Sequence, residues 1–466
     1  MAGDAAARIE GYCGVVKYGL LVNTKAVMSL WMAGQFLAIM NTTMFNISVP
    51  NMIADIDVSV ETGSWIVAGY SIGFALSTLI YSRLSEVVPI RRLVTAGLAA
   101  LGAGSVFGFF AWDFYSLLSA RMLQSAGAGT LTGLGMVVIR RYIPADRRGR
   151  AIAFLSAGST LAFALGPIAG GAISTFYGWN GLFLVTSLVL LLLPPLFRLL
   201  PQEQAKPFQF DLLGALLTLL NMTLLLAVLT QRSISLLFAC AASFLAHAIH
   251  VRKVRHPLIP VALFRLPGYG KLVAVGFLLL VSNLANLFLM PIVLADLFHK
   301  TSMEIGLIIA PGAMLAAFSS RYIGRWIDRR GNMMFLLAGH LAAAAVLGVF
   351  TLHLSVSAAV ILIGYVIYAP ANTTMLASLH HETLRMLPGD AAGSGIGFMQ
   401  LIQYAGGSIA VAFSGFMISV QNQLPAVFAY QQIYAVMEAV TLASLGFVVW
   451  YRLRMKRNER KGTCEF

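Results

Sequence analysis

The sequence is dominated by apolar stretches that are each long enough to cross a lipid bilayer. A crossing takes roughly 20 helical residues, and about fourteen such stretches follow one another along the chain. Backbone groups in lipid must be satisfied internally, as in helices or closed barrels. We therefore expect an all-α polytopic membrane protein. The predicted spans are 26–50, 63–85, 93–112, 115–142, 150–174, 179–199, 211–230, 233–250, 271–298, 303–327, 333–352, 355–379, 391–420 and 428–452.

Composition agrees with a membrane protein. Hydrophobic residues make up 59% of the chain and charged residues 11%, whereas a soluble domain has about 25% charged residues. The formal net charge is +14. Basic residues beside membrane spans set topology and face anionic lipid heads, so we expect a lipid bilayer and no nucleic acid as partner. The scattered cysteines Cys13, Cys240 and Cys464 indicate no disulfide framework.

Loop lengths divide the chain into two halves. The longest loops, 201–210 and 251–270, flank the seventh and eighth spans. This pattern predicts two six-helix halves with two extra helices between them. The predicted parts are an N-terminal tail over 1–25, a first half over 26–200, a linker with two extra transmembrane helices over 201–270, a second half over 271–452 and a basic tail over 453–466.

Charge predicts the orientation of the spans. Loops after even-numbered spans are basic, and the segment 140–150 alone carries five arginines. The opposite loops carry Asp55, Asp57, Glu61 and Asp113 and almost no basic residue. By the positive-inside rule we expect both termini to be cytoplasmic in a plasma (inner) membrane protein.

Two loops in corresponding places of the halves resemble each other. The first reads S-R-L-S-E-V-V-P-I-R-R over 82–92, and the second reads G-R-W-I-D-R-R-G over 324–331. Each places an acid at a helix end with basic residues just after it. Such an acid can bond the other half in one conformation and release it in another, although the charges can also serve only to set topology. The predicted cytoplasmic gate comprises Glu86, Arg91, Arg92, Asp328, Arg329 and Arg330.

The fifth predicted span contains the sequence G-P-I-A-G-G over 166–171. Pro167 would disrupt a soluble helix but is tolerated in a membrane bundle. Gly170 and Gly171 lack side chains, so another helix can approach them closely. We expect a bent, close-packed crossing here, with Gly166 at its start.

Several stretches together resemble the major facilitator superfamily, and within it the fourteen-span drug:proton antiporters. They are N-T-T-M-F-N-I-S-V-P over 41–50, the loop over 82–92, R-M-L-Q-S-A-G-A-G over 121–129, M-V-V-I-R-R-Y-I-P over 136–144, G-P-I-A-G-G over 166–171 and I-D-R-R-G over 327–331. The resemblance covers about 31–452. It implies a transporter whose halves rock about a central site, and the stretch over 166–171 implies export rather than import.

The chain also departs from that family's patterns. Glu86 stands where an Asp is usual, and Ser82 and Pro89 stand where glycines are usual. Asn41 occupies a first-helix position that is often Asp. Acids of the fourteen-span tetracycline exporters appear here as Thr42, Phe163 and Ala405. The resemblance therefore designates no particular substrate.

Arg121 lies inside the fourth predicted span. A membrane-buried Arg costs at least ~2.5 kcal/mol on insertion scales, so it must be paired or face water. It could change partners as a nearby site gains or loses a proton; alternatively, it could bond backbone carbonyls permanently. Gln124, three residues on, shares its helix face.

Glu438 is the acidic residue placed deepest in a predicted span, about ten residues into the last one. A carboxyl group there is desolvated and could carry a proton across the membrane. The alternatives are a permanently protonated Glu bonded to a neighbouring helix and a Glu that faces a water-filled crevice. Our proton-coupling candidates are Glu438, Arg121 and His340.

Other polar residues punctuate the apolar spans. Some must form hydrogen bonds between helices, and each such bond contributes around 0.6 kcal/mol. Others could line a substrate cavity. The cavity candidates are Gln35, Asn41, Asn46, Gln124, Asn283, Asn286, Asn372, Gln400 and Gln403.

The sequence offers no catalytic or phosphate-binding motif, so we expect neither an enzyme nor an ATP-driven pump. His380-His381-Glu382 does not have the H-E-x-x-H spacing of a zinc site, and we expect no metal and no cofactor. The predicted function is an alternating-access exporter of amphipathic drugs or related small molecules, driven by proton antiport and acting as a monomer. The alternatives are a dedicated exporter of one metabolite, such as a siderophore or antibiotic, and a non-transporting membrane sensor or scaffold.

Overall fold

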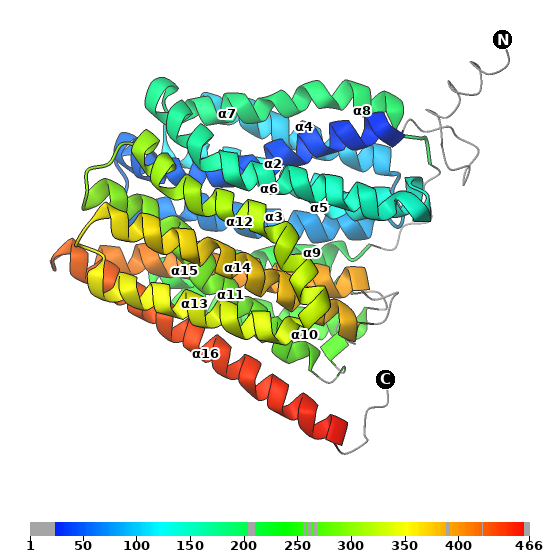
Figure 1. The fold of residues 1–466 in the computed structure, drawn as a ribbon. Coiled ribbons are helices and arrows are strands. Elements are labelled where there is room, and N and C mark those ends of the chain that lie inside the picture. The colour runs from blue at the N-terminus through cyan, green and yellow to red at the C-terminus, as the bar shows by residue number, and fades with distance from the viewer. Residues whose placement is uncertain are drawn as a thin grey trace, which may run out of the picture.

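The computed structural model describes residues 24–203, 210–254, 257–258, 263–264, 266, 268–387, 392–421 and 423–460. Every regular element in this part of the chain is a helix, and the helices run side by side as one elongated bundle (Figure 1). The all-α membrane fold predicted from the sequence is confirmed.

The first half consists of helices α2 to α8. The bounds are α2 Thr24–Ile56, α3 Val60–Leu84, α4 Ile90–Phe109, α5 Phe114–Tyr142, α6 Ala145–Tyr177, α7 Asn180–Ser187, the 3₁₀ helix η1 Leu188–Leu192 and α8 Leu193–Leu199. The last three follow without a break and make one crossing from Asn180 to Leu199. A capping box between Asp113 and Ser116 begins α5, which satisfies backbone N–H groups that have no partner within the helix.

The second half consists of helices α11 to α16. The bounds are α11 Tyr269–Asp296, α12 Ser302–Arg330, α13 Asn332–His353, α14 Ala358–Met386, α15 Ala392–Val420 and α16 Ala426–Arg460. Pro291, Pro311 and Pro370 lie inside these helices, as a packed membrane bundle permits. We expected the last helix to end at residue 452 and the basic tail to follow. Helix α16 instead continues to Arg460.

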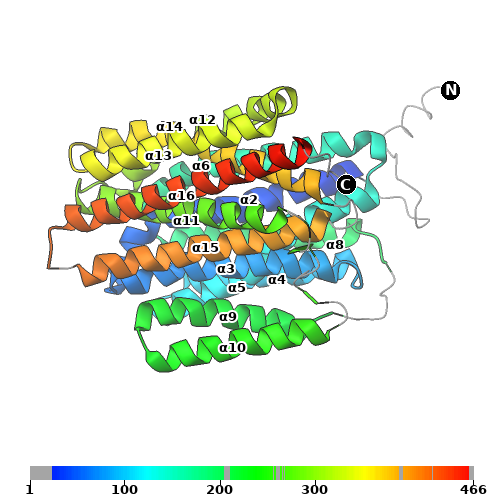
Figure 2. The same ribbon diagram turned by 90° about the horizontal axis from the view of Figure 1, so that it is seen from below.

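Helices α9 Leu212–Gln231 and α10 Ile234–Lys253 form a hairpin on one edge of the bundle. Figure 2 shows the hairpin beside α3 and α15, and α9 contacts both of them. Asn221 on α9 bonds His247 on α10, with 2.8 Å between Nδ2 and Nδ1. Much of the two loops that flank this hairpin lies outside the described residues.

Thirteen helices in the described part are long and apolar enough to cross a membrane. The first predicted span, α2, is not among them. Its residues Gln35, Asn41, Asn46 and Asn51 lower its hydropathy, but its length of 33 residues exceeds what a crossing needs. Helix α2 runs the length of the bundle beside α6 (Figure 1), so the described chain holds the number of crossings that we expected.

The bundle has one end rich in arginine, which we call the basic end. It carries Arg83, Arg140, Arg252, Arg329 and Arg385 near the ends of α3, α5, α10, α12 and α14. Helix α2 begins there and α16 ends there, to the right in Figure 1. This grouping agrees with the charge pattern from which we inferred the orientation.

Candidate functional site

A cavity of about 600 Å³ lies between the two halves. Helices α2, α3, α5 and α6 line it from the first half, and α11, α12, α14 and α15 line it from the second. Its volume falls within the range of about 300–1,000 Å³ that small-molecule sites occupy. Both halves of the bundle thus contribute side chains to a cavity large enough for a small molecule.

Helices α6 and α12 meet closely on one side of the cavity. A Cβ atom added at Gly171 would lie 2.4 Å from the Ser302 carbonyl oxygen, and one at Gly306 would lie 2.3 Å from the Pro167 oxygen. Glycine at both positions therefore permits backbone-to-backbone contact. The cavity lining on these helices runs from Ile152 to Pro167 and from Ile309 to Ser320, so the cavity lies on the basic-end side of this contact.

The other residues of the 166–171 stretch pack against α2. Added Cβ atoms would lie 1.8 Å from the Thr43 hydroxyl at Gly166 and 2.7 Å from Met44 backbone atoms at Gly170. Pro167 lines the cavity. The stretch thus fixes α6 between α2 and α12 at the boundary of the cavity.

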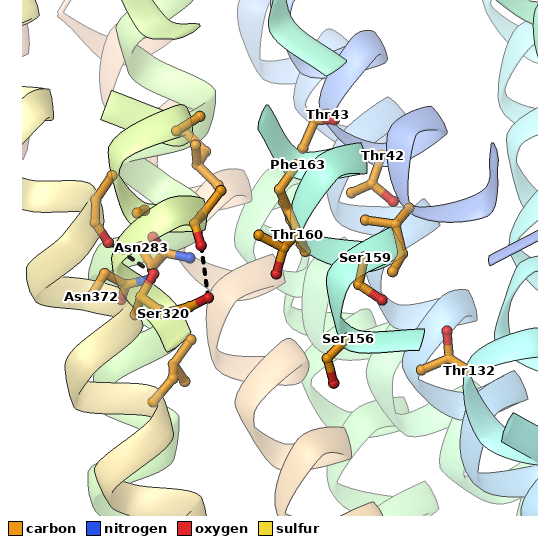
Figure 3. Close-up of a pocket in the computed structure, with 18 of the residues that line it drawn as sticks. Thr42, Thr43, Thr132, Ser156, Ser159, Thr160, Phe163, Asn283, Ser320 and Asn372 are labelled. Atoms are coloured by element: carbon orange, nitrogen blue, oxygen red, sulfur yellow. Dashed lines mark hydrogen bonds between the residues drawn. The ribbon is translucent and has the colours of Figure 1, made fainter. Parts of the chain in front are cut away.

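One wall of the cavity carries hydroxyl groups. Ser156, Ser159, Thr160 and Phe163 lie on one face of α6, at the i, i+3, i+4 spacing of a helical stripe (Figure 3). Gln35 on α2 donates a hydrogen bond to Ser159, with 2.7 Å between Nε2 and Oγ. We did not predict this stripe, although serine and threonine recurring at helical spacing would have indicated it.

The opposite wall carries amide groups. Asn283 on α11, Asn372 on α14 and Gln400 on α15 line the cavity, and Figure 3 shows Asn283, Asn372 and Ser320 facing the α6 stripe across open space. Of the cavity candidates from the sequence, the structure places Gln35, Asn46, Asn283, Asn372 and Gln400 in the lining.

The remaining cavity candidates lie elsewhere. Asn41 and Gln124 surround Arg121. Asn286 accepts a hydrogen bond from Tyr434 on α16, at 3.2 Å. Gln403 is 2% exposed and lies beside Gly276. Asn41, Gln124 and Asn286 thus form hydrogen bonds between helices or with Arg121, which was the alternative role we gave such amides.

Arg121 is 1% exposed and sits behind the α2 wall of the cavity. Its Nη1 donates to Asn41 Oδ1 at 3.2 Å and to Gln124 Oε1 at 2.8 Å. Its guanidinium lies between the rings of Phe45 and Tyr70, 4.0 Å and 3.8 Å from their centroids, which stabilises a buried cation. None of the acidic residues described in the structure pairs with it.

A short chain of side chains connects Arg121 to the cavity. The Tyr70 hydroxyl lies 3.3 Å from Asn41 Nδ2 and 3.5 Å from the Thr42 hydroxyl. Thr42 lines the cavity. Thr42, Phe163 and Ala405 stand where the tetracycline exporters carry acids. Phe163 also lines the cavity, whereas Ala405 is buried outside the lining.

The other two proton-coupling candidates lie between α13 and α16. The Thr351 hydroxyl donates to Glu438 Oε2 at 3.3 Å. His340 is buried, with Nε2 2.9 Å from the Ser444 hydroxyl and Nδ1 2.7 Å from the Leu336 carbonyl. Neither residue lines the cavity, so the structure does not bring them together with Arg121.

Among the predicted gate residues whose side chains the structure describes, none forms an ion pair or hydrogen bond between the two halves. Glu86 pairs with Arg83 on its own helix end at 3.7 Å and is largely exposed. Arg91 stacks 3.6 Å above the centroid of the Phe197 ring, and Arg92 and Arg329 are exposed. The side chains of Asp328 and Arg330 lie outside the described part.

Glu203, which we did not predict, connects elements at the basic end of the first half. Its carboxylate accepts hydrogen bonds from Arg141 at 3.2 Å, from the Tyr142 hydroxyl at 2.8 Å and from the Ile90 N–H at 3.0 Å. It thereby joins the loop after α8 to the end of α5 and the start of α4. This contact could not be predicted, because Glu203 lies in a loop with no recognisable motif.

A cavity between the two halves of a bundle of membrane-spanning helices is typical of membrane transporters. Residues 31–411 match the sequence profile of the Major Facilitator Superfamily, and the chain belongs to this family. The predicted family is thus confirmed, and it identifies a multi-pass membrane transporter rather than an enzyme. Among the described residues, no group of three or more His, Cys, Asp or Glu is placed to hold a metal ion.

Several curated proteins are similar to the chain. The uncharacterized MFS-type transporter YhcA of Bacillus subtilis is 24% identical over 84% of this chain and 76% of its own. The riboflavin transporter RibZ of Clostridioides difficile is 24% identical over 66% of this chain and 68% of its own. The putative multidrug resistance protein MdtD of Salmonella heidelberg is 23% identical over 86% of this chain and 88% of its own.

Solved structures share the fold. A POT family transporter in complex with a thioalcohol-conjugated peptide has a TM-score of 0.71 at 14% identity, over 95% of this chain and 99% of its own. A bacterial homolog of the human lysosomal transporter Spinster, inward-facing and occupied, has a TM-score of 0.67 at 14% identity, over 92% and 97%.

Proposed function

We propose that the chain exports amphipathic small molecules by alternating access, driven by proton antiport. The observation that carries this proposal is the cavity between the halves, bounded on one side by the glycine contact between α6 and α12. A substrate enters from the basic end, which we place in the cytoplasm. The halves then rock so that the α6–α12 contact opens and the basic end closes.

The lining suits amphipathic cargo. Apolar side chains such as Phe163, Met136 and Leu287 share the cavity with hydroxyl and amide groups. Apolar walls bind by burial, and a few polar groups orient the ligand. The similarity to MdtD, a putative multidrug resistance protein, supports export of this class.

Proton coupling is the second part of the proposal. Arg121 is in contact with the cavity through Tyr70 and Thr42, so it can respond to an occupant. Glu438 and His340 are the titratable groups that we assign to proton carriage within α13 and α16. The predicted gate, once closed, would join Glu86 to the second half at the basic end.

The test is substrate-dependent proton release from everted membrane vesicles across a panel of amphipathic drugs. We expect release with wild-type protein and with Asp57→Asn, a control at an exposed loop acid. Glu438→Gln keeps the shape of the side chain but cannot titrate, so it should abolish pH-driven export and retain substrate binding. Normal pH-driven export by Glu438→Gln would remove this residue from the mechanism, and absence of release with every compound would overturn the proposed function.

A further inference from the structure

The cavity wall carries no formal charge in the part of the chain that the structure describes. Its lining combines apolar side chains with the hydroxyls of Ser, Thr and Tyr and the amides of Asn and Gln, and includes no Asp, Glu, His, Lys or Arg. Other membrane-buried polar residues do include titratable groups, since Arg121, His340 and Glu382 are at most 2% exposed. The charged groups among the described residues therefore lie outside the cavity lining.

The buried cation Arg121 is separated from the cavity by other side chains. Arg121 lies behind Tyr70 and donates to Asn41 and Gln124. It is not part of the lining, so it cannot form a hydrogen-bonded pair with an anionic ligand there. Its charge nonetheless lacks a carboxylate partner among the described residues and raises the cost of placing a cation nearby.

The polar groups of the lining are incompletely used within the protein. The Oδ1 atom of Asn372, a residue only 8% exposed, has no hydrogen-bond partner among the described residues. The same holds for Gln35 Oε1 and the Thr132 hydroxyl on the opposite side. Buried polar groups are ordinarily satisfied, so these groups mark where an occupant or its water supplies hydrogen bonds.

The cavity does little to offset the cost of removing an ion from water. When both ends close around a substrate, an ion loses most of its water and finds no opposite charge in the wall. A molecule without net charge loses only hydrogen bonds to water, which the amides and hydroxyls replace. The lining therefore discriminates by charge, not only by apolar area.

We propose that the cavity selects amphipathic substrates without net charge, with hydrogen-bond donors that reach Gln35 and Thr132 on one wall and Asn372 on the other. This inference rests on the proposed function and specifies its substrate class. Cations and anions of the same size bind at least tenfold more weakly. The apolar body of the substrate lies between these groups, against Phe163 and Leu287.

Two pairs of compounds that differ mainly in charge test the inference. Purified wild-type protein is equilibrated with N-acetylpuromycin or puromycin at pH 6, where the puromycin amine is largely protonated, and with riboflavin or riboflavin 5′-phosphate. Affinities are measured by equilibrium dialysis. We expect the neutral member of each pair to bind at least tenfold more tightly. Equal binding within the pairs would overturn the inference and leave export itself intact.

A charge introduced into the cavity wall provides a second test of the inference. Asn283 lines the cavity and is partly exposed to it. Asn283→Asp adds a carboxylate with almost no change in size, whereas Asn283→Leu removes the amide without adding charge. We expect puromycin to bind Asn283→Asp at least tenfold more tightly than Asn283→Leu, even if wild-type protein binds none of the four compounds. No difference between the two variants would show that wall charge does not set selectivity, whatever the outcome of the vesicle assay.

Discussion

At the scale of single residues, the most unusual feature beside the cavity is the buried Arg121, which pairs with none of the described acidic residues. Arg121 is held by two amides, Asn41 and Gln124, and by two aromatic rings. Each of these contacts uses the planar shape of the guanidinium, which a point charge cannot reproduce. Thr186 also reaches Asn41 Oδ1 at 3.3 Å, so α7 belongs to the same network.

Replacement of Arg121 separates charge from shape. Arg121→Lys keeps the charge and should retain part of export, because an ammonium group can bond one of the two amides. Arg121→Ala leaves Asn41 and Gln124 without their donor, which costs roughly 1–3 kcal/mol, and should lower export at least tenfold. Export is measured at matched membrane abundance, and wild-type export by Arg121→Ala would exclude Arg121 from the coupling mechanism.

How far the sequence predicted the site depends on the residue. Arg121 was found because a charged residue in lipid is costly wherever it occurs. Its ring partners Phe45 and Tyr70 were not found, because aromatic residues are common in every span and only tertiary packing distinguishes these two. Single amides were ambiguous for the same reason: Asn283 lines the cavity, whereas Asn286, one turn on, bonds Tyr434.

At the scale of elements, the contact between α6 and α12 determines which side of the cavity is closed. It depends on glycine at 171 and 306 and is supported by a hydrogen bond from the Met303 N–H to the Thr175 hydroxyl at 3.1 Å. The contact is specific to these positions, since Gly324 on the same helix has no atom within 4 Å of an added Cβ.

A methyl group at this contact should shift the conformational equilibrium. Gly306→Ala places a Cβ against the Pro167 carbonyl, so the helices must separate and the basic end should close more often. Spin labels at the exposed residues Arg150 and Trp326 report the separation of α6 and α12 at that end. We expect a larger short-distance population in Gly306→Ala than in the control Gly324→Ala, which has the same gain in helix propensity. Identical distance distributions would contradict the role of this contact.

The start of α9 provides a pH-dependent element outside the membrane-spanning residues. Asp211 caps α9 through the Gly214 N–H at 2.8 Å, and it also accepts from the Leu258 N–H at 3.0 Å and lies 2.6 Å from His250 Nε2. Burial alone would raise the pKa of the Asp211 carboxyl, but the His250 contact and the two backbone hydrogen bonds together lower it.

Because folding lowers the pKa of Asp211, the contribution of Asp211 to stability should decrease at low pH. The stabilisation from ionised Asp211 is present above the ordinary Asp pKa of about 3.9 and is lost as pH falls through the lower folded value. Asp211→Ala should therefore destabilise the protein by about 1 kcal/mol at pH 7. The difference from wild type should shrink below about pH 4. Thermal unfolding in detergent measures both, and a difference that is unchanged at low pH would contradict this role.

At the scale of the whole molecule, repetition in the sequence was the most reliable signal. The number of crossings follows from apolar periodicity, because every crossing must satisfy the same lipid environment. The family follows from short motifs. The conformation could not be predicted. Gate residues such as Glu86 and Arg91 occur in the sequence whether the gate is open or closed, and here Glu86 bonds only Arg83 among the described residues.

The uncharged cavity has a consequence for energetics. A neutral substrate exchanged for protons moves net charge across the membrane, so export should respond to membrane potential as well as to pH. One elementary charge crossing 100 mV is worth about 2.3 kcal/mol, which corresponds to a ~50-fold substrate gradient. A charged substrate exchanged for an equal charge would instead be electrically silent.

Charge movement by the reconstituted protein tests whether export of a neutral substrate is coupled to protons. Proteoliposomes adsorbed on a solid-supported membrane are exposed to N-acetylpuromycin at symmetric pH, and the transient current is recorded. We expect a current in the direction of proton movement, opposite to the movement of the substrate. Arg121→Ala should lower this current at least tenfold, and Asp57→Asn should retain it. Uptake of the same neutral compound without any current would contradict proton-driven export through an uncharged cavity.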